Sequence, residues 1–161
     1  FKNDIVNFTN EYEEEYFKNK IILGVHIRCT DMVSTKQNKN CFYFIDKIKH
    51  VLAKHNIDKI FIASDSNEVV CKVIDIFGKD KILAINNIER VNTIDDPTGS
   101  HHRINTDIIK YSSRKYHNYL CGKEVLIDML LLSKCNYLIR SFSCVSDMAI
   151  FFNDKMSEVY N

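Results

Sequence analysis

Apolar positions follow two different spacings along this chain, one typical of helices and one typical of buried strands. The first spacing opens the sequence among acidic residues, where one helical face is formed by Phe1, Ile5, Phe8, Tyr12 and Tyr16. The second follows at once in the apolar run IILGVHI, residues 21–27, which predicts a buried strand. We therefore expect an N-terminal amphipathic helix or linker segment at 1–20, followed by one domain at 21–161.

Strand and helix patterns then alternate to the end of the sequence. Further strands are predicted at 59–64, 81–85 and 136–140. Helices are predicted at 40–56, 67–77 and 119–134, with a last one starting near Cys144. Between them, the polar stretch 86–116 predicts a long loop. This alternation predicts an α/β fold, a Rossmann-like parallel sheet with helices on both faces.

Composition narrows the class of protein. The chain has 161 residues, 45% of them hydrophobic, and a net charge of +1, which gives no electrostatic case for a nucleic-acid partner. No apolar run reaches the length of about 18 residues that a transmembrane segment needs, and the start lacks a signal-peptide pattern. The six cysteines form no CxxC pair, so we expect reduced, mostly buried thiols in a cytoplasmic protein.

Polar side chains gather where the predicted strands end, which is where parallel sheets bind ligands. The first strand ends in His26 and Arg28, the second in Asp65, and the last in Ser141 and Ser143. An arginine at the end of a buried strand needs a carboxylate or an anionic ligand, and its planar fork suits a phosphate. These residues predict an anion site at this edge of the sheet.

Structural alternatives exist for the strand-end residues. Asp65, with Glu68 three residues later, has the spacing of a helix N-cap and its capping-box partner. Arg28 has Asp65 and Asp31 as possible ion-pair partners within the protein. His26 taken alone is more typical of a hydrogen-bonded core histidine than of a ligand contact.

Alternatives also exist on the last two helices. Ser143 has the position of an N-cap for the last helix. Asp128 follows Glu124 by one helical turn, which favours a place beside it on the solvent face. Other kinds of site are weaker: no GxGxxG follows the first strand, and the pair His101-His102 has no clear third ligand, so we expect neither an NAD site nor a metal.

Four segments resemble one known family. GVHIRCTD at 24–31 resembles the HxRRTD motif of the GDP-fucose-dependent α1,6-fucosyltransferases of the Nod-factor and core N-glycan type. IFIASDS at 60–66 is similar to their strand ending in ATDD, and TGSHHRIN at 98–105 to their loop with a GxHxRY-like string. GKEVLIDMLLLSKCNYLIRSFSCVS at 122–146 is similar to their GVILDIHFLS…TFSS segment. The resemblance runs from about residue 21 to 155.

The resemblance implies a fold and a reaction. Family members have two Rossmann-like halves facing across a cleft, the GT-B arrangement, and this chain resembles the C-terminal, donor-binding half. The implied reaction is inverting transfer of fucose from GDP-fucose to a glycan or glycolipid acceptor, without a metal or other cofactor. The missing N-terminal half would be needed for activity, so this chain alone is expected to be inactive. A peripheral place at the inner membrane face is compatible with a lipid-linked acceptor.

Individual roles follow from the matched positions. Arg28 would bind the β-phosphate, and Ser141 and Ser143 would assist from the segment that opens the last helix. His26 and Asp128 would contact the guanine, since a carboxylate can accept both N–H donors of its Watson–Crick edge. Asp65 would be a structural or donor-side carboxylate.

The sequence departs from the family pattern where the base is expected. The second arginine of the motif is Cys29 here, and Met32 and Lys36 replace a lysine and a glutamate of the core-glycan members. If that glutamate is their base, Asp31 or a residue of the missing half would replace it. The same departures favour an alternative function, a non-catalytic nucleotide- or glycan-binding domain.

Overall fold

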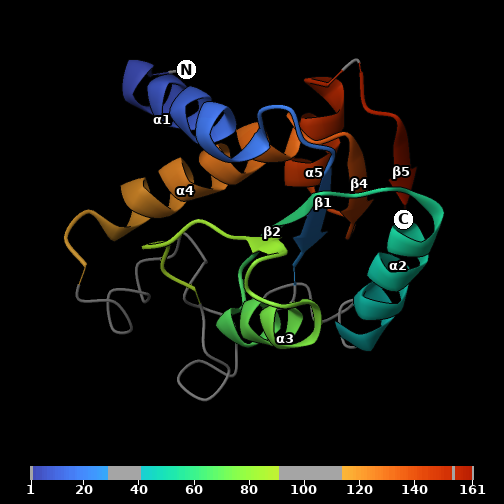
Figure 1. The fold of residues 1–161 in the computed structure, drawn as a ribbon. Helices are drawn as coiled ribbons and strands as arrows, with labels where there is room; N and C mark the ends of the chain where they lie inside the picture. Colours follow the sequence, from blue (N-terminus) through green and yellow to red (C-terminus); the bar gives the residue numbers. More distant parts are fainter. Residues whose placement is uncertain (1, 29–40, 91–113, 154, 161) are drawn as a thin grey trace.

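The computed structural model describes residues 2–28, 41–90, 114–153 and 155–160. The elements run α1 (Asn3–Tyr12), η1 (Glu13–Phe17), β1 (Ile22–Ile27), α2 (Cys41–Lys54), β2 (Lys59–Ser64) and α3 (Asn67–Phe77). They continue with β3 (Ile82–Leu83), α4 (His117–Leu132), β4 (Tyr137–Arg140), α5 (Cys144–Phe151) and β5 (Glu158–Tyr160) (Figure 1). Strands and helices alternate as the hydrophobic pattern predicts.

The strands form one five-stranded sheet in the order β3-β2-β1-β4-β5, and every neighbouring pair is parallel. The central strand β1 pairs with β2 through His26 opposite Ala63, and with β4 through His26 opposite Arg140. All three chain segments therefore end at the same edge of the sheet, and the predicted Rossmann-like α/β fold is confirmed.

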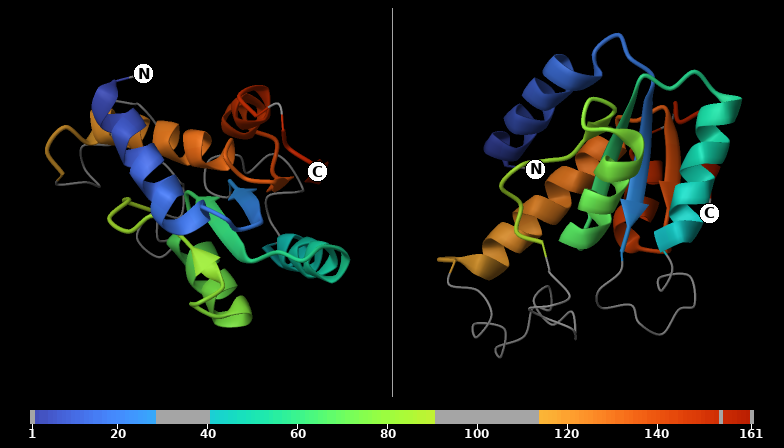
Figure 2. Two further views of the ribbon diagram at one scale, coloured as in Figure 1. Left: turned by 45° about the horizontal axis from the view of Figure 1, so that its top comes forward. Right: turned by 60° about the horizontal axis from the view of Figure 1, so that its bottom comes forward.

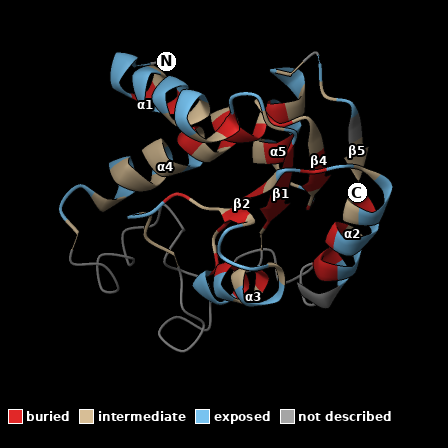
Figure 3. Cartoon of the chain, in the orientation of Figure 1, coloured by how far each residue is buried: buried red, intermediate tan, exposed pale blue. Residues whose placement is uncertain are grey.

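Helices cover both faces of the sheet, as predicted (Figure 2). One core, which includes Ile48 of α2 and Val73 of α3, covers the first face. A second core, which includes Ile5 of α1, Leu131 of α4 and Ala149 of α5, covers the other. The strands between these layers are the most buried part of the chain (Figure 3), which explains why they read as continuous apolar runs.

Two strands differ from the prediction. The third strand is only Ile82–Leu83, although the apolar pattern extends over 81–85. Among the described residues β3 is an edge strand, and only Ile82 and Leu83 pair with β2, so the following alanine and isoleucine are not part of the strand. The fifth strand, Glu158–Tyr160, was not predicted, because three residues are too short to establish an alternating pattern.

The N-terminal segment is helical, but its end differs from an ideal α-helix. After Tyr12 the helix widens into a π turn over Glu13–Phe17, closed by the Lys18 N–H donating to the Glu13 carbonyl at 2.9 Å. The π turn places Phe17 against Phe61 of β2, with ring centroids 5.6 Å apart in an edge-on arrangement. No helix among the described residues is long and apolar enough to cross a membrane.

Candidate nucleotide cleft

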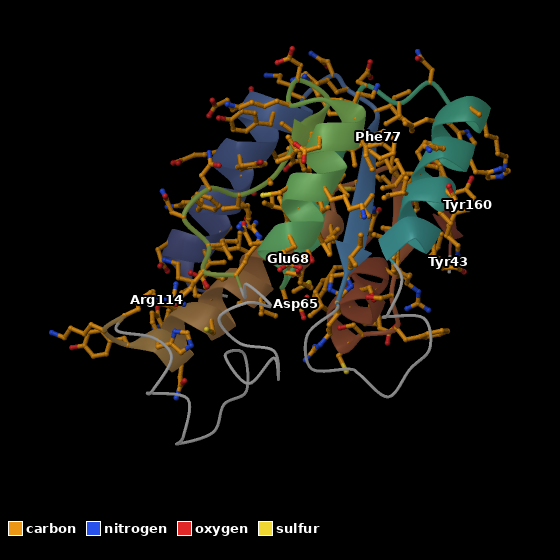
Figure 4. The ribbon with its side chains drawn as sticks, turned by 90° about the horizontal axis from the view of Figure 1, so that it is seen from below. Tyr43, Asp65, Glu68, Phe77, Arg114 and Tyr160 are labelled. Atoms are coloured by element: carbon orange, nitrogen blue, oxygen red, sulfur yellow. The ribbon has the colours of Figure 1, made fainter. Side chains whose placement is uncertain are left out.

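A cleft of about 270 Å³ opens at the carboxyl ends of β1 and β2, and is lined further by the segment after β3, by α4 and by the start of α5. Its polar lining includes His26, Arg28, Ser64, Asp65, Glu124 and Asp128. Four residues predicted from the sequence, His26, Arg28, Asp65 and Asp128, therefore share one cavity, although they are up to 102 positions apart along the chain. In Figure 4 this edge of the sheet lies toward the bottom of the picture, where Asp65 and Glu68 are seen at the start of α3.

Ser141 joins the ends of the two central strands beside the cleft. Its hydroxyl oxygen accepts a hydrogen bond from the Arg28 N–H at 3.1 Å, and its own N–H donates to the His26 carbonyl at 3.0 Å. The hydroxyl also lies 3.4 Å from Nδ1 of His26. Because Ser141 is buried and its oxygen is occupied by these contacts, it fixes the backbone on which His26 and Arg28 stand.

His26 is buried and neutral. Burial lowers its pKa to about 4; nearby Asp65 acts in the opposite direction, and Arg28 reinforces the lowering. A neutral ring with a hydroxyl at Nδ1 has one donor and one acceptor nitrogen. His26 thus combines the two predicted interpretations: it is a hydrogen-bonded core histidine, and it also lines the cleft.

Asp128 projects from α4 into the cleft with an unusual carboxyl group. Its Oδ1 is buried and has no hydrogen-bond partner, and burial raises the pKa of the group to about 7. Arg90 opposes that rise, and Glu124 adds to it. The alternative of a solvent-facing Asp128 is therefore wrong. Helix α4 packs against both α1 and the sheet, so the side of the helix that carries Asp128 faces inward.

Of the two predicted helix N-caps, one is wrong and one is confirmed. Ser66, not Asp65, caps α3: its hydroxyl accepts from the Val69 N–H at 3.4 Å. The N-cap interpretation of Asp65 is wrong by one residue, and its side chain lines the cleft instead. Ser143 does cap α5, accepting from the Val145 N–H at 3.3 Å, so the structural interpretation of this serine is confirmed.

An ion-pair network that the sequence did not predict includes Glu89 and Glu124, two residues that line the cleft. The guanidinium of Arg114 contacts both carboxylate oxygens of Glu124, at 2.5 and 3.2 Å, and lies 2.8 Å from Glu89. Glu89 also lies 3.3 Å from His117, whose Nε2 is 3.4 Å from the Cys121 sulfur. The network ties the segment after β3 to the first turns of α4. Its members are scattered in sequence, so no motif indicates it.

Arg90 was likewise not predicted. Its Nε donates to the Ser64 carbonyl at 3.2 Å, and a terminal nitrogen donates to the Ile85 carbonyl at 3.2 Å. One guanidinium thus connects the carboxyl end of β2 to the segment after β3. The nearest signal in the sequence is the carboxylate of Asp128 on an apolar helix, which would need a cation nearby.

Several predicted residues lie outside the described part of the chain. These are the proposed base Asp31, the motif departures Cys29, Met32 and Lys36, and the histidine pair of the TGSHHRIN segment. Most of the predicted loop 86–116 is also outside it. Among the residues that are described, no three histidine, cysteine or acidic side chains gather as a metal site.

The described cysteines are all free thiols, as expected, but they are less buried than expected. Cys135 is buried, Cys121 is half-buried, and Cys71 and Cys144 are exposed. Cys71 of α3 and Cys144 of α5 therefore lie on helix faces that are open to solvent.

Comparison with known proteins supports the fold. The sequence matches no protein-family profile and no curated protein. The structure is similar to the crystal structure of the fucosyltransferase NodZ from Bradyrhizobium, with a TM-score of 0.62 and 20% identity. NodZ α1,6-fucosyltransferase structures soaked with GDP-fucose or co-crystallised with GDP give a TM-score of 0.61 and 20% identity.

These matches include 94% of this chain but only 42–43% of each NodZ chain. The chain therefore spans about two-fifths of the length of the proteins it is similar to. At this identity the likeness shows a shared fold, a Rossmann-like domain of the kind found in a fucosyltransferase.

Proposed function

We propose that this chain is the donor-binding half of a glycosyltransferase that uses GDP-fucose. The observation that carries the proposal is the pairing of a cationic and an acidic group in one cleft: Arg28 and Asp128 both line it, and the Asp128 Oδ1 is buried without a partner. The NodZ structures of similar fold were soaked with GDP-fucose or crystallised with GDP.

The chemistry of the two groups suits the two ends of GDP. A guanidinium binds a diphosphate through two parallel charged hydrogen bonds. A carboxylate accepts the N1–H and 2-amino N–H of guanine, which would satisfy a buried oxygen that otherwise has no partner. Uracil offers a single N–H between two carbonyl oxygens, so UDP would leave one carboxylate oxygen facing another acceptor.

The proposed reaction breaks the bond between the fucose anomeric carbon and the β-phosphate oxygen. The acceptor hydroxyl oxygen forms the new bond from the opposite side, and its proton passes to a carboxylate. Arg28 would stabilise the negative charge that grows on the departing GDP. Asp31 remains our proposed base, and the acceptor, a glycan or glycolipid, would be held by a second half-domain like that of the other GT-B enzymes.

Calorimetric titration with GDP and UDP tests the donor site. We expect GDP to bind and UDP to bind more weakly. Arg28→Ala should weaken GDP binding by about 1.5–3 kcal/mol, the range for a hydrogen bond to a charged group. Arg140→Ala is the matched control, because this arginine ends the neighbouring strand and pairs with Asp147. Equal affinity for both nucleotides, or no binding of either, would contradict the proposal.

A non-catalytic nucleotide- or glycan-binding domain is the alternative function. It shares the GDP site but lacks the transfer step, so nucleotide binding does not separate the two. Turnover of GDP-fucose by a longer protein containing this chain does: release of GDP with transfer to an acceptor supports the enzyme, and tight binding without turnover supports the alternative.

A further inference from the structure

Beside the cleft lies a cation, Arg90, that neither the sequence pattern nor the proposed donor contacts explain. Arg90 follows β3, yet its guanidinium reaches back to the Ser64 carbonyl at the end of β2, with an Nε–O distance of 3.2 Å. Its second hydrogen bond, to the Ile85 carbonyl, is also 3.2 Å long. Ser64 itself lines the cleft. Two fixed hydrogen bonds therefore hold this charge at the edge of the site.

Asp128 is the acidic group on which this charge acts. Its Oδ1 is buried and has no partner in the described part of the chain, so the carboxyl group keeps a hydrogen-bonding capacity that a ligand can use. Arg90 favours the ionised carboxylate, whereas burial and Glu124 favour the protonated acid.

We propose that Arg90 is a positioning residue of the nucleotide site, which holds the cleft wall and keeps Asp128 available as a carboxylate acceptor for the two N–H donors of guanine. This inference rests on the proposed function, because it concerns how the same site selects its base. It predicts that base recognition is linked to a proton on Asp128.

The direction of that linkage follows from the chemistry of the two forms. The carboxylate accepts two hydrogen bonds and suits guanine. The protonated acid donates one and accepts one, which suits adenine, with its N1 acceptor and 6-amino donor. Because burial raises the pKa of Asp128 to about 7, both forms are populated near neutral pH. GDP affinity should rise as the pH rises through about 7, and ADP affinity should fall.

Other titratable groups lie near Asp128 on the elements packed around it. Glu124 lies one turn earlier on α4 and is held by Arg114. Tyr12 faces Asp128 from α1; its phenol has a raised pKa, mainly through burial, and stays neutral across the range tested.

The strand ends also carry titratable and charged groups near Asp128. His26 and Arg28 of β1 and Asp65 after β2 line the same cleft. Burial lowers the pKa of His26 to about 4, so its charge does not change between pH 6 and 8.5. This leaves Asp128 as the group whose ionisation Arg90 and Glu124 set in opposite directions.

The test is a calorimetric titration of GDP and ADP between pH 6 and 8.5 into four proteins: the unaltered chain, Arg90→Met, Arg90→Lys and Lys123→Met. Removing the cation should stabilise the protonated acid and move the midpoint of the GDP profile to higher pH. We expect Arg90→Met to bind GDP at least about threefold more weakly at pH 6.5, with a smaller loss at pH 8.5 and no loss for ADP. Arg90→Lys should restore the profile.

Lys123→Met is the charge-matched control. This lysine lies on α4, the helix that carries Asp128, but it pairs with Asp4 of α1. It should leave both profiles unchanged. Glu124→Gln is a further variant, which removes the neighbouring anion and should move the GDP midpoint to lower pH. It keeps the test decisive if Arg90→Met does not fold, as judged by circular dichroism.

The outcomes separate the two proposals. If GDP does not bind the unaltered chain, the proposed function fails. If GDP binds with a midpoint that Arg90→Met and Glu124→Gln leave in place, or if Arg90→Met weakens GDP and ADP equally at every pH, Arg90 has only a structural role and this inference is overturned.

Discussion

The Ser141 hydroxyl oxygen accepts a hydrogen bond from the Arg28 N–H at 3.1 Å, across the carboxyl ends of two neighbouring strands. This contact orients the backbone of the residue that we assign to the diphosphate. It also explains why a serine of the last strand belongs to the site without its hydroxyl being open to a ligand: the oxygen already has Arg28 and His26 as neighbours.

Ser141→Ala should therefore lower both stability and GDP affinity. The Arg28 N–H would lose its acceptor, and an unsatisfied buried donor costs about 1–3 kcal/mol. Chemical denaturation measures the first effect and calorimetry with GDP the second. Ser143→Ala is the comparison for stability: it removes the N-cap of α5, which costs about 1 kcal/mol. A Ser141→Ala protein as stable as the unaltered chain would contradict this role.

Asp128 should make the protein less stable as the pH rises. Its pKa in the folded chain is about 7, against 3.8 for the ordinary group, so the unfolded chain loses its proton first. The contribution of Asp128 to the free energy of unfolding is therefore largest below about pH 4. It is lost as the pH rises toward 7, by up to about 4 kcal/mol.

Asp128→Asn should remove that loss, because an amide does not titrate. We expect the variant to be more stable than the unaltered chain at pH 7 and similar to it near pH 4, as measured by urea denaturation at each pH. The same variant should bind GDP less well, since an amide offers one acceptor in place of two. Equal stability of the two proteins at pH 7 would show that burial does not raise the pKa of the Asp128 carboxyl group.

The sequence was sufficient for the fold because the strands are buried on both faces. Continuous apolar runs such as residues 59–64 mark a parallel sheet, and the polar residue after each run marks its ligand-binding edge. The strand Glu158–Tyr160 was not predicted, because it has too few residues to show a period.

The site was predicted in part, and the limit has a physical cause. His26, Arg28 and Asp65 stand at strand ends, so topology alone brings them together. Arg90 and Arg114 lie on connecting segments, whose paths depend on packing and not on local pattern. Asp128 was assigned correctly to the cleft only through the family resemblance, because helical spacing favoured the wrong face.

Close packing beneath the cleft gives a test of the fold itself. A methyl group added at Gly24 of β1 would lie 3.0 Å from the Cys135 sulfur and 3.2 Å from a Leu132 methyl. Gly24→Ala should destabilise the chain by about 1–3 kcal/mol through overpacking. Gly122→Ala is the matched control, since nothing lies within 4 Å of its added methyl and alanine favours a helix by about 0.5–1 kcal/mol. Thermal melting should move in opposite directions for the two variants.

The thiol of Cys121 reports on the cleft without a mutation in it. Its sulfur lines the cavity, 3.4 Å from a terminal nitrogen of Arg114. Burial raises the pKa of this thiol, and the Arg114 guanidinium opposes the rise. Alkylation by iodoacetamide requires the thiolate, so the reaction should be slow at pH 7 and faster at pH 9.

GDP bound in the cleft should slow that alkylation severalfold by covering the sulfur. Peptide mass mapping after timed labelling gives the rate at each cysteine, and the exposed Cys71 and Cys144 are internal controls that GDP should leave unchanged. Arg28→Ala should abolish the protection at the same GDP concentration. Protection of all three thiols, or of none under conditions where calorimetry detects GDP binding, would place the nucleotide outside this cleft.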